Sequence, residues 1–585
     1  MYNIAPRARF SSSVGNGLFN SASLDLHFAK TKNLVDATTG ASLVTFTRAS
    51  SGTFVGSDGV LRSAVTNLGL RSEKLDEAAQ WSVIGSGATL TATTDVAAPN
   101  GAMTAWTLTS SGASAQIQQA PIGISGATYT GSFYIRRRSG TGTINIRVSE
   151  NINTPLVGVT SEWQRFSLTA TSTSTTIRLG VNLSGTADAV DLWGAQLEQS
   201  TTVGEYIPTT STINSAPRFD HNPTTGESLG LLVEEARTNS IRNNTGVGAV
   251  AGTPGTLPTN WSVASSVSGL SSQIIGTGTE SGIAYIDIKW TGTPSANGTI
   301  QHTFESNTNT AAVSGQSWTS AVYQRLVGGV IPGTTSLLVV ERSVANSFLA
   351  SSSTNVTVTD SALINQRLAH SRTLNNALTA YVNSRLDVSV VSGVAVDFTF
   401  RIGLPQLELG AFATSPILTS TAAATRSADV ASITGTAFSS WYQEDEGTWF
   451  ADFNGTSIAS GQFSRIIELN DGTSSNLIRV QQYAANLVRA SVSTNGAGQF
   501  AADNGSVAVG IRGKVAFGSA FNDAALVTNG ASPTVDTAYL TPVGLTQLGI
   551  GAPPGGSTSV LNSTIRRITY WPTRLANSTL QSITQ

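Results

Sequence analysis

The sequence has 585 residues, of which only 12% are charged, and it contains 57 glycines and no cysteine. A chain of this length predicts roughly three to five domains, and its 40% hydrophobic content excludes a disordered protein. The formal net charge of -2 provides no basic surface, so we expect no nucleic-acid partner. The absence of cysteine excludes disulfides, thiol nucleophiles and thiolate zinc sites.

The features of a membrane or exported protein are also missing. No apolar run approaches the roughly 20 residues that span a bilayer. No apolar stretch follows Arg7 and Arg9, as it would in a secretory signal. We therefore expect no membrane insertion and, for a protein that acts outside a cell, release by lysis or as part of a particle.

Most of the chain predicts short antiparallel strands rich in β-branched and aromatic residues, bounded by Gly, Ser, Asn or Pro. The clearest are residues 130–138, 143–149, 163–171, 175–183, 336–343 and 394–403. Their spacing of about 8 to 14 residues favours sandwiches or jelly rolls over parallel α/β sheets. Only residues 75–81 and 233–239 suggest short helices. The predicted fold class is all-β, with tandem antiparallel β-sandwich or jelly-roll domains after an extended N-terminal arm.

An internal duplication organises the first two thirds of the chain. The paired segments are 78–83 with 258–263, 126–137 with 315–326, 163–169 with 365–373, and 190–200 with 400–410. Each successive pair lies further apart, so the second copy has longer loops but the same strand order. The predicted domains are an arm and particle-docking segment (1–66), module 1 (67–209), a connector (210–240), module 2 (241–420), a linker (421–440) and a third sandwich (441–585).

Three segments resemble the leader and connector of structural proteins of tailed bacteriophages and prophages, namely SLDLHFAK (23–30), residues 44–62 and residues 216–244. In that family such segments accompany jelly rolls similar to carbohydrate-binding modules, whose last strand carries a GAQLE-like signature. Here the signature is GAQLE (194–198) and, degenerate, PQLE (405–408). The C-terminal part resembles concanavalin/laminin-G-like sandwiches, with GTWFADF as an early strand.

The resemblance implies a virion structural protein, a tail fibre or baseplate appendage that binds host surface glycans non-catalytically during adsorption. It also implies a homotrimer that contacts other virion proteins, folds in the host cytoplasm and is exposed on the released particle. Alternatives are a head decoration or spike protein, a tailspike-type polysaccharide depolymerase, and a bacterial adhesin unrelated to particles. These alternatives stay open at this point.

The patterns that suggest catalysis have structural explanations. Residues 226–230 match G-x-S-x-G, but a turn replaces the strand that a nucleophile elbow requires, so we expect a turn followed by a strand. Asp220 and His221 would point to opposite faces of a strand. The acidic groups Glu234-Glu235 and Glu444-Asp445-Glu446 could act on glycosidic bonds, but solvated loop charge is the simpler interpretation.

Metal and nucleotide sites have little support. His27, His221, His302 and His370 lack zinc-ligand spacing and are expected at surfaces or interfaces, and no phosphate-binding loop occurs, because Val515 follows Gly513-Lys514. The sequence implies no cofactor, with a structural calcium ion near Asp471 as the weak candidate.

Glycan binding requires aromatic faces beside hydrogen-bonding side chains. Alternation within residues 129–138 places Tyr129, Gly131, Phe133 and Ile135 in the core, with Tyr134 and Arg136 on the opposite face. The duplication pairs these two residues with Tyr323 and Arg325. We therefore predict glycan contacts at Tyr134, Arg136, Tyr323 and Arg325, whereas Trp81, Trp163 and Trp261 are expected to anchor the core or its rim.

Overall fold

The computed structural model describes residues 17–150, 152–305, 310–458 and 462–585. Its regular structure is almost entirely antiparallel β-sheet, which confirms the predicted all-β class. The helical elements are short: α2 (Phe28–Thr31), α3 (Gly435–Ser439), α4 (Asn577–Thr584) and the 3-10 helices η1 (Leu363–Asn365) and η2 (Ala484–Asn486). In this described part no helix has the length and hydrophobicity of a membrane span.

Module 1 is a sandwich of two five-stranded sheets. One sheet runs in the order β13 (Gln164–Thr171), β10 (Thr128–Ser139), β15 (Asp188–Glu198), β8 (Trp106–Ser110) and β7 (Ala88–Ala92). The other runs β12 (Ile152–Pro155), β11 (Ile144–Val148), β14 (Leu179–Leu183), β9 (Ala115–Gln119) and β6 (Ser82–Ile84). Tyr129, Phe133 and Ile135 are buried between the sheets, which confirms the predicted alternation in β10.

Module 2 repeats this arrangement with longer strands. Its first sheet runs β21 (Leu270–Glu280), β22 (Ile283–Gly292), β30 (Val396–Leu409), β25 (Ser317–Val330) and β28 (Arg367–Thr373). Its second runs β20 (Ser262–Ser265), β23 (Gly298–Phe304), β29 (Tyr381–Val390), β26 (Thr335–Arg342) and β27 (Phe348–Val356), with β24 (Thr310–Ala311) against β29. Trp81 of module 1 and Trp261 of module 2 are both buried in their cores, as predicted.

The third sandwich is discontinuous in sequence. One sheet contains β17 (Arg218–His221), β18 (Ser228–Val233), β42 (Ser563–Trp571), β33 (Glu446–Asn454), β38 (Arg512–Ala520), β39 (Asp523–Thr528) and β40 (Thr534–Asp536), with β1 (Leu24–Leu26) also on β42. The other contains β2 (Thr45–Thr47), β32 (Val430–Thr434), β41 (Gln547–Ile550), β34 (Phe463–Asn470), β35 (Leu477–Tyr483), β36 (Leu487–Thr494) and β37 (Ala497–Ser506).

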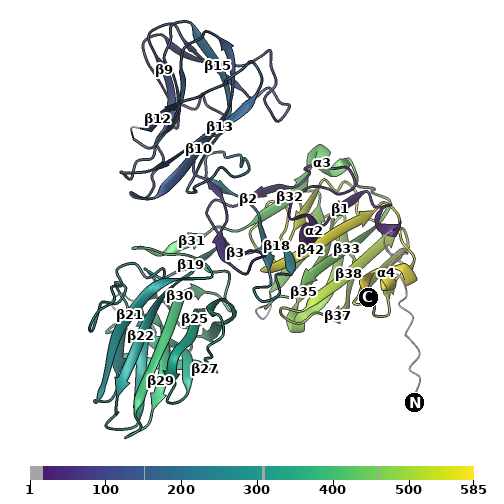
Figure 1. Cartoon of the computed structure of the whole chain (residues 1–585). Coiled ribbons are helices and arrows are strands. Elements are labelled where there is room, and N and C mark those ends of the chain that lie inside the picture. Colours follow the sequence, from purple (N-terminus) through teal and green to yellow (C-terminus); the bar gives the residue numbers. More distant parts are fainter. Residues whose placement is uncertain (1–16, 151, 306–309, 459–461) are drawn as a thin grey trace, which may run out of the picture. The chain divides into compact units, whose positions relative to one another are not determined.

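The predicted arm and connector therefore need correction, because their described parts supply strands to this sandwich. Figure 1 shows β1 and β18 beside β42. Leu24 and Leu26 are fully buried in the core, and Asp25 between them accepts two hydrogen bonds of 2.7 Å from Arg567. The expected linker 421–440 likewise contains β32 and α3. The chain thus leaves the sandwich after β2 to build module 1 and after β18 to build module 2. Residues 1–16 of the expected docking segment lie outside the described residues.

A pair of short strands closes the base of each module. They are β5 (Thr66–Asn67) with β16 (Asn214–Ser215), and β19 (Arg237–Asn239) with β31 (Ala424–Arg426). An asparagine side chain makes equivalent hydrogen bonds at the base of each module. The Asn67 amide donates to the carbonyls of Ala195 and Ile207, and the Asn239 amide donates to those of Pro405 and Ile417.

The GAQLE-like signature completes this closure. The Gln196 amide donates to Glu198 and accepts from the Ile207 N–H at 2.8 Å. In module 2 the Gln406 amide donates to Glu408 and accepts from the Ile417 N–H at 2.7 Å. The signature therefore fastens the segment that returns from each module, a structural role that needs no ligand.

The two predicted helices are wrong. Residues 75–81 form turns, in which Leu75 and Trp81 pack into the core of module 1. Residues 233–239 contain no helix: β18 ends at Val233, residues 234–236 have no regular structure, and β19 begins at Arg237. Both segments are too short for helical propensity to outweigh tertiary contacts.

Candidate functional site

An aromatic cluster lies on the outer face of the β10 sheet of module 1. Tyr134 on β10 pairs in register with Trp193 on β15, and their ring centroids are 5.3 Å apart. Tyr206 lies 4.7 Å from Trp193, and the Trp193 indole N–H donates to the Thr104 hydroxyl. Tyr134 is half-buried and Trp193 is buried, so this face is an aromatic cluster rather than an open polar surface.

Arg136 is held beside this cluster by charge. Its Nε lies 3.6 Å from a carboxylate oxygen of Asp191, which is fully buried. The other oxygen of Asp191 accepts from Arg138 at 2.6 Å and from the Thr107 hydroxyl at 2.7 Å. Glycan contacts by Tyr134 and Arg136 remain a prediction.

The corresponding face of module 2 is closed, so Tyr323 is not the open ligand surface that the duplication predicts. Tyr323 is only 4% exposed and packs with Leu61, Leu363 and Leu404. The reason is that Gly403 stands opposite Tyr323, where Trp193 stands opposite Tyr134 in module 1. A Cβ atom on Gly403 would come within 2.6 Å of Ile283, so aliphatic side chains occupy the space that the tryptophan fills in module 1.

Leu61 belongs to a hairpin formed by β3 (Thr53–Val55) and β4 (Leu61–Ser63). Its backbone N–H donates to the Ser281 carbonyl at 2.9 Å. This hairpin comes from the segment 44–62 that resembles the phage leader. The hairpin therefore supplies part of the cover over Tyr323.

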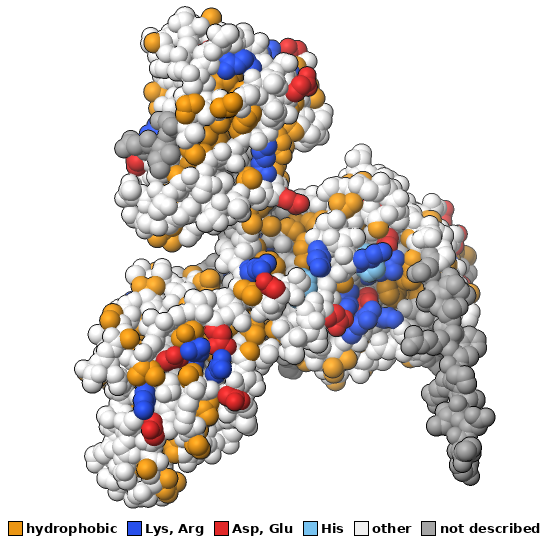
Figure 2. Space-filling model, viewed as in Figure 1, with side chains coloured by type: hydrophobic (Ala, Val, Ile, Leu, Met, Phe, Trp, Pro, Cys, Tyr) orange, Lys and Arg blue, Asp and Glu red, His pale blue; other side chains and the backbone are white. Residues whose placement is uncertain are grey.

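Arg325 is also engaged. Its Nη1 lies 2.9 Å from both carboxylate oxygens of Glu280, and Glu280 also pairs with Arg401 at 2.6 Å. The Arg401 guanidinium stacks 3.5 Å from the centre of the Tyr285 ring and pairs with Asp287. Figure 2 shows basic and acidic side chains gathered on this face of module 2. The group is a self-paired network that cross-links β21, β22, β25 and β30.

An open depression of about 410 Å³ lies in module 1. This volume falls within the usual range for small-molecule sites, roughly 300 to 1,000 Å³. Its lining combines apolar, charged and hydroxyl side chains: Met103, Ala105, Trp106 and Pro208, then Arg71, Glu73 and Lys74, then Thr104, Thr209 and Thr210. Such a mixture can bind a sugar ring, which presents C–H groups on its faces and hydroxyls around its edge.

Two hydrogen bonds order the lining. The Trp106 indole N–H donates to the Glu73 carbonyl at 3.0 Å, which fixes the ring. The Tyr206 hydroxyl donates to the Glu73 carboxylate at 3.2 Å, so a hydrogen bond connects the aromatic cluster to the depression. Burial raises the pKa of Glu73. None of the lining residues was singled out by the sequence patterns.

A second depression of about 590 Å³ lies over the other sheet of module 1. Gln80, Gln118 and Arg178 line it, together with aliphatic side chains such as Leu70 and Ile122. Arg178 pairs with Glu150 at 3.3 Å, and the Gln118 side chain accepts from Arg147 at 3.0 Å. It contains no aromatic side chain.

The residues 226–230 form the predicted turn before β18. Gly226 has φ +68°, and Ser228 is the first residue of the strand. Asp220 accepts a hydrogen bond of 2.7 Å from the Val55 N–H, and the Nδ1 atom of His221 lies 3.0 Å from the Val55 carbonyl. Both side chains thus bind β3 rather than each other. Burial raises the pKa of Asp220 to about 6.

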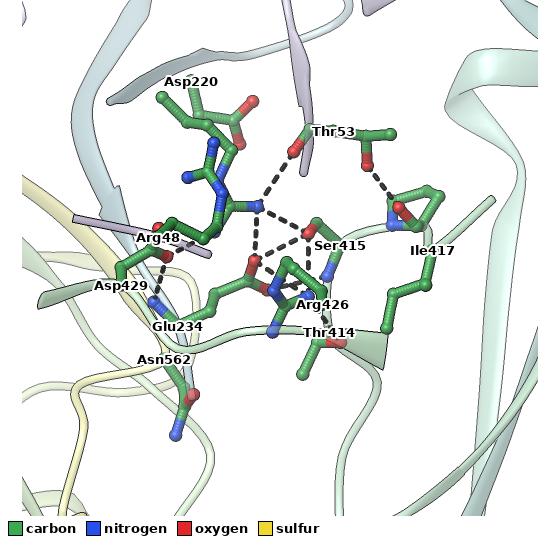
Figure 3. A network of polar contacts seen from close by, with 12 residues as sticks. Arg48, Thr53, Asp220, Glu234, Thr414, Ser415, Ile417, Arg426, Asp429 and Asn562 are labelled. Atoms are coloured by element: carbon green, nitrogen blue, oxygen red, sulfur yellow. Dashed lines mark hydrogen bonds and ion pairs between the residues drawn. The ribbon is translucent and has the colours of Figure 1, made fainter. Parts of the chain in front are cut away.

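Glu234 lies in a buried ionic network rather than in a solvated loop (Figure 3). Its carboxylate pairs with Arg218 at 2.7 Å and with Arg426 at 3.3 Å, and it accepts from the Ser415 N–H and hydroxyl. Arg218 also pairs with Asp429 at 2.5 Å. Burial alone would raise the pKa of Glu234, but Arg426 and Arg218 outweigh it and lower the pKa to about 2. This network ties the end of β18 to β17 and to residues 415–429.

The other acidic candidates also have structural partners. Glu444 accepts from the Gly544 N–H at 2.9 Å, and Glu446 accepts from the Arg574 N–H at 2.8 Å. Asp471 accepts from the Thr473 N–H and hydroxyl and from the Asn476 amide, so its carboxylate caps a turn. Nowhere among the described residues do three His, Asp or Glu side chains gather as a metal site would require.

His302 corrects the expectation that the histidines lie at surfaces or interfaces. It is 1% exposed, its Nε2 accepts from the Trp290 indole N–H at 3.1 Å, and its Nδ1 lies 3.1 Å from the Leu386 carbonyl. Burial lowers the pKa of His302 to about 4. It is a neutral core histidine.

No family model matches this chain, and no curated protein matches it. Among solved structures, the chain is similar to the CBM40 module of the Ruminococcus gnavus IT-sialidase, with 17% identity over 24% of this chain and 84% of that chain and a TM-score of 0.22. The tandem CBM22 domains of Paenibacillus barcinonensis Xyn10C show 11% identity over 57% of this chain and 94% of that chain, with a TM-score of 0.18. Trypanosoma rangeli sialidase in complex with sialic acid shows 10% identity over 91% of this chain and 96% of that chain, with a TM-score of 0.22. The strand pairing itself shows the all-β sandwich fold.

Proposed function

We propose that this chain is a structural protein of a tailed-bacteriophage virion, part of a tail fibre or baseplate appendage, that binds host surface glycans through module 1 without cleaving them. The observation that carries glycan binding is the depression of module 1. Its volume suits a small ligand, and its lining combines the fixed ring of Trp106 with charged and hydroxyl side chains. The virion assignment depends on the resemblance of residues 23–30, 44–62 and 216–244 to phage leaders and connectors.

Binding without catalysis is favoured by the contacts of the acidic candidates. Retaining and inverting glycosidases use two carboxyl groups that flank the sugar, about 5 to 9.5 Å apart. Glu234 is ion-paired and buried, while Glu444 and Glu446 each accept a backbone N–H. These carboxylates make structural contacts within the fold, so they do not support a depolymerase.

In this proposal the protein folds in the host cytoplasm, forms a homotrimer, contacts other virion proteins and is exposed on the released particle. Each module leaves the sandwich and returns to it, and a pair of short strands joins the two ends of each module, which suits that setting.

Electron cryomicroscopy of the purified particle tests the virion assignment. The proposal expects three copies per appendage at the tail or baseplate. Density for the chain on the head would favour a decoration protein, and its absence from the particle would contradict the virion assignment while leaving glycan binding to be measured separately. Release of reducing ends from host polysaccharide would contradict binding without cleavage.

A further inference from the structure

Arg71 is distinctive among the arginines that the structure describes. Each of the others has a hydrogen bond, ion pair or ring contact for its guanidinium, whereas the Arg71 side chain has none. Arg71 is half-buried and lines the depression of module 1. Its charge is therefore available to a ligand in that depression.

The backbone gives no reason for arginine at this position. Arg71 has φ +52°, in the left-handed region that favours glycine and asparagine. Its counterpart in module 2 is Asn243, which has φ +55° and follows Asn239 by the same interval that separates Arg71 from Asn67. The backbone N–H of Arg71 donates to the Thr210 carbonyl, as that of Asn243 donates to Ser420. Module 2 thus makes the same turn with a residue that tolerates it.

Trp106 and Met103 provide an apolar wall within the same depression. The Trp106 ring is fixed by the bond from its indole N–H to Glu73, and Met103 is 53% exposed. Lys74 adds a second positive charge to the lining, with its Nζ 3.9 Å from the exposed Asp76 carboxylate. An apolar wall can pack against a ring, and an unpaired guanidinium can bind an anionic group, so the depression suits a ring that carries an anionic substituent.

We propose that this depression is a subsite for an acidic saccharide, whose ring lies against Trp106 and whose anionic substituent pairs with Arg71. The inference rests on the proposed glycan binding and specifies its chemical class. A guanidinium binds carboxylate, sulfate and phosphate oxygens through two parallel N–H bonds, so the shared chemistry is an anionic oxygen group on a sugar.

A glycan array probed with the full-length protein tests this inference. The array carries oligogalacturonate, its methyl ester, sulfated dextran, phosphorylated mannan and unmodified dextran. The wild-type protein is expected to bind at least one acidic saccharide and to bind the methyl ester or unmodified dextran at least tenfold more weakly. The carboxylated, sulfated and phosphorylated arms identify the anionic group.

The decisive variant is Arg71→Asn, because asparagine occupies the same turn in module 2. It is expected to keep or raise thermal stability and to weaken acidic-saccharide binding at least tenfold, whereas Arg71→Lys retains part of the binding. Arg62→Asn removes an exposed arginine that pairs with Asp58 and does not line the depression, and it is expected to leave binding unchanged. Undiminished binding by the folded Arg71→Asn variant would overturn the inference.

The array also separates this inference from the proposed function. Binding of neutral glycans alone would overturn the acidic subsite and leave glycan binding intact. If no glycan on the array is bound, both the inference and the proposed glycan binding fail.

Discussion

The buried network around Glu234 gives the most quantitative prediction, and Glu234→Gln is the perturbation. The substitution keeps the shape but removes the charge that faces Arg218 and Arg426, which are both buried. A fall of the Glu234 pKa from 4.5 to about 2 corresponds to about 3 kcal/mol at roughly 1.4 kcal/mol per unit. Breaking a buried ion pair typically costs about 3 to 5 kcal/mol. We therefore expect the free energy of unfolding to fall by about 3 to 5 kcal/mol at pH 7.

The pH dependence provides a second, independent result. The folded carboxylate has a lowered pKa, so its contribution is complete above pH 4.5 and is lost as pH falls through about 2. At pH 3.5 the wild-type protein should have lost about 1.4 kcal/mol of this contribution, and the difference from Glu234→Gln should shrink by that amount. Urea unfolding followed by tryptophan fluorescence at both pH values measures the difference.

Glu235→Gln is the matched control, since Glu235 is adjacent but more exposed and pairs with Arg237. Exposed pairs contribute up to about 1 kcal/mol. The reasoning is refuted if Glu234→Gln destabilises the protein no more than Glu235→Gln at pH 7.

Three further predictions concern the fold. Asn239→Ala removes side-chain hydrogen bonds to the carbonyls of Pro405 and Ile417, so the free energy of unfolding measured in urea should fall by about 2 to 4 kcal/mol. A fall below about 1 kcal/mol would contradict the closure described for the module base. Gly403→Ala should lower the free energy of unfolding by about 1 to 3 kcal/mol because the added Cβ meets Ile283, whereas Gly328→Ala, whose Cβ would have no neighbour within 4 Å, should be neutral. Equal melting temperatures for the two variants would argue against close packing at Gly403. The pKa of His302 is lowered in the folded protein, so its contribution to stability should be complete above pH 6.5 and decline as pH falls towards about 4. His302→Gln should flatten this part of the Tm-against-pH curve, and an unchanged slope would show that another group titrates.

The strand pattern predicted the fold class because alternation fixes which side chains face the core. Tyr129, Phe133 and Ile135 are buried as that pattern requires. The pattern could not predict the discontinuous sandwich, because β1 has only three residues and its partner β42 lies at the far end of the chain. Three residues carry too little periodicity to identify a strand, and pairing over such a distance leaves no local signal.

The residues that line the proposed glycan site could not be predicted from the sequence, although the aromatic cluster beside it could be predicted in part. The duplication correctly aligned Tyr134 with Tyr323, but side-chain exposure depends on the opposing strand, where Trp193 is replaced by Gly403. That difference is visible in the aligned segments 190–200 and 400–410 and signals that the two faces differ. Arg71 opposite Asn243 is a similar signal, although the left-handed backbone that makes it informative appears only in the structure.

The number of glycan molecules bound per chain tests the central claim most directly. The outer face of module 1 has the open depression that Trp106 lines, whereas the face of module 2 that carries Tyr323 is covered. Isothermal titration of the full-length protein with a glycan selected from the array should therefore give one site per chain, weakened by Trp106→Ala and unaffected by Leu338→Ala on the other sheet of module 2. Two equivalent sites per chain, or one site that survives Trp106→Ala in a folded protein, would contradict binding through module 1.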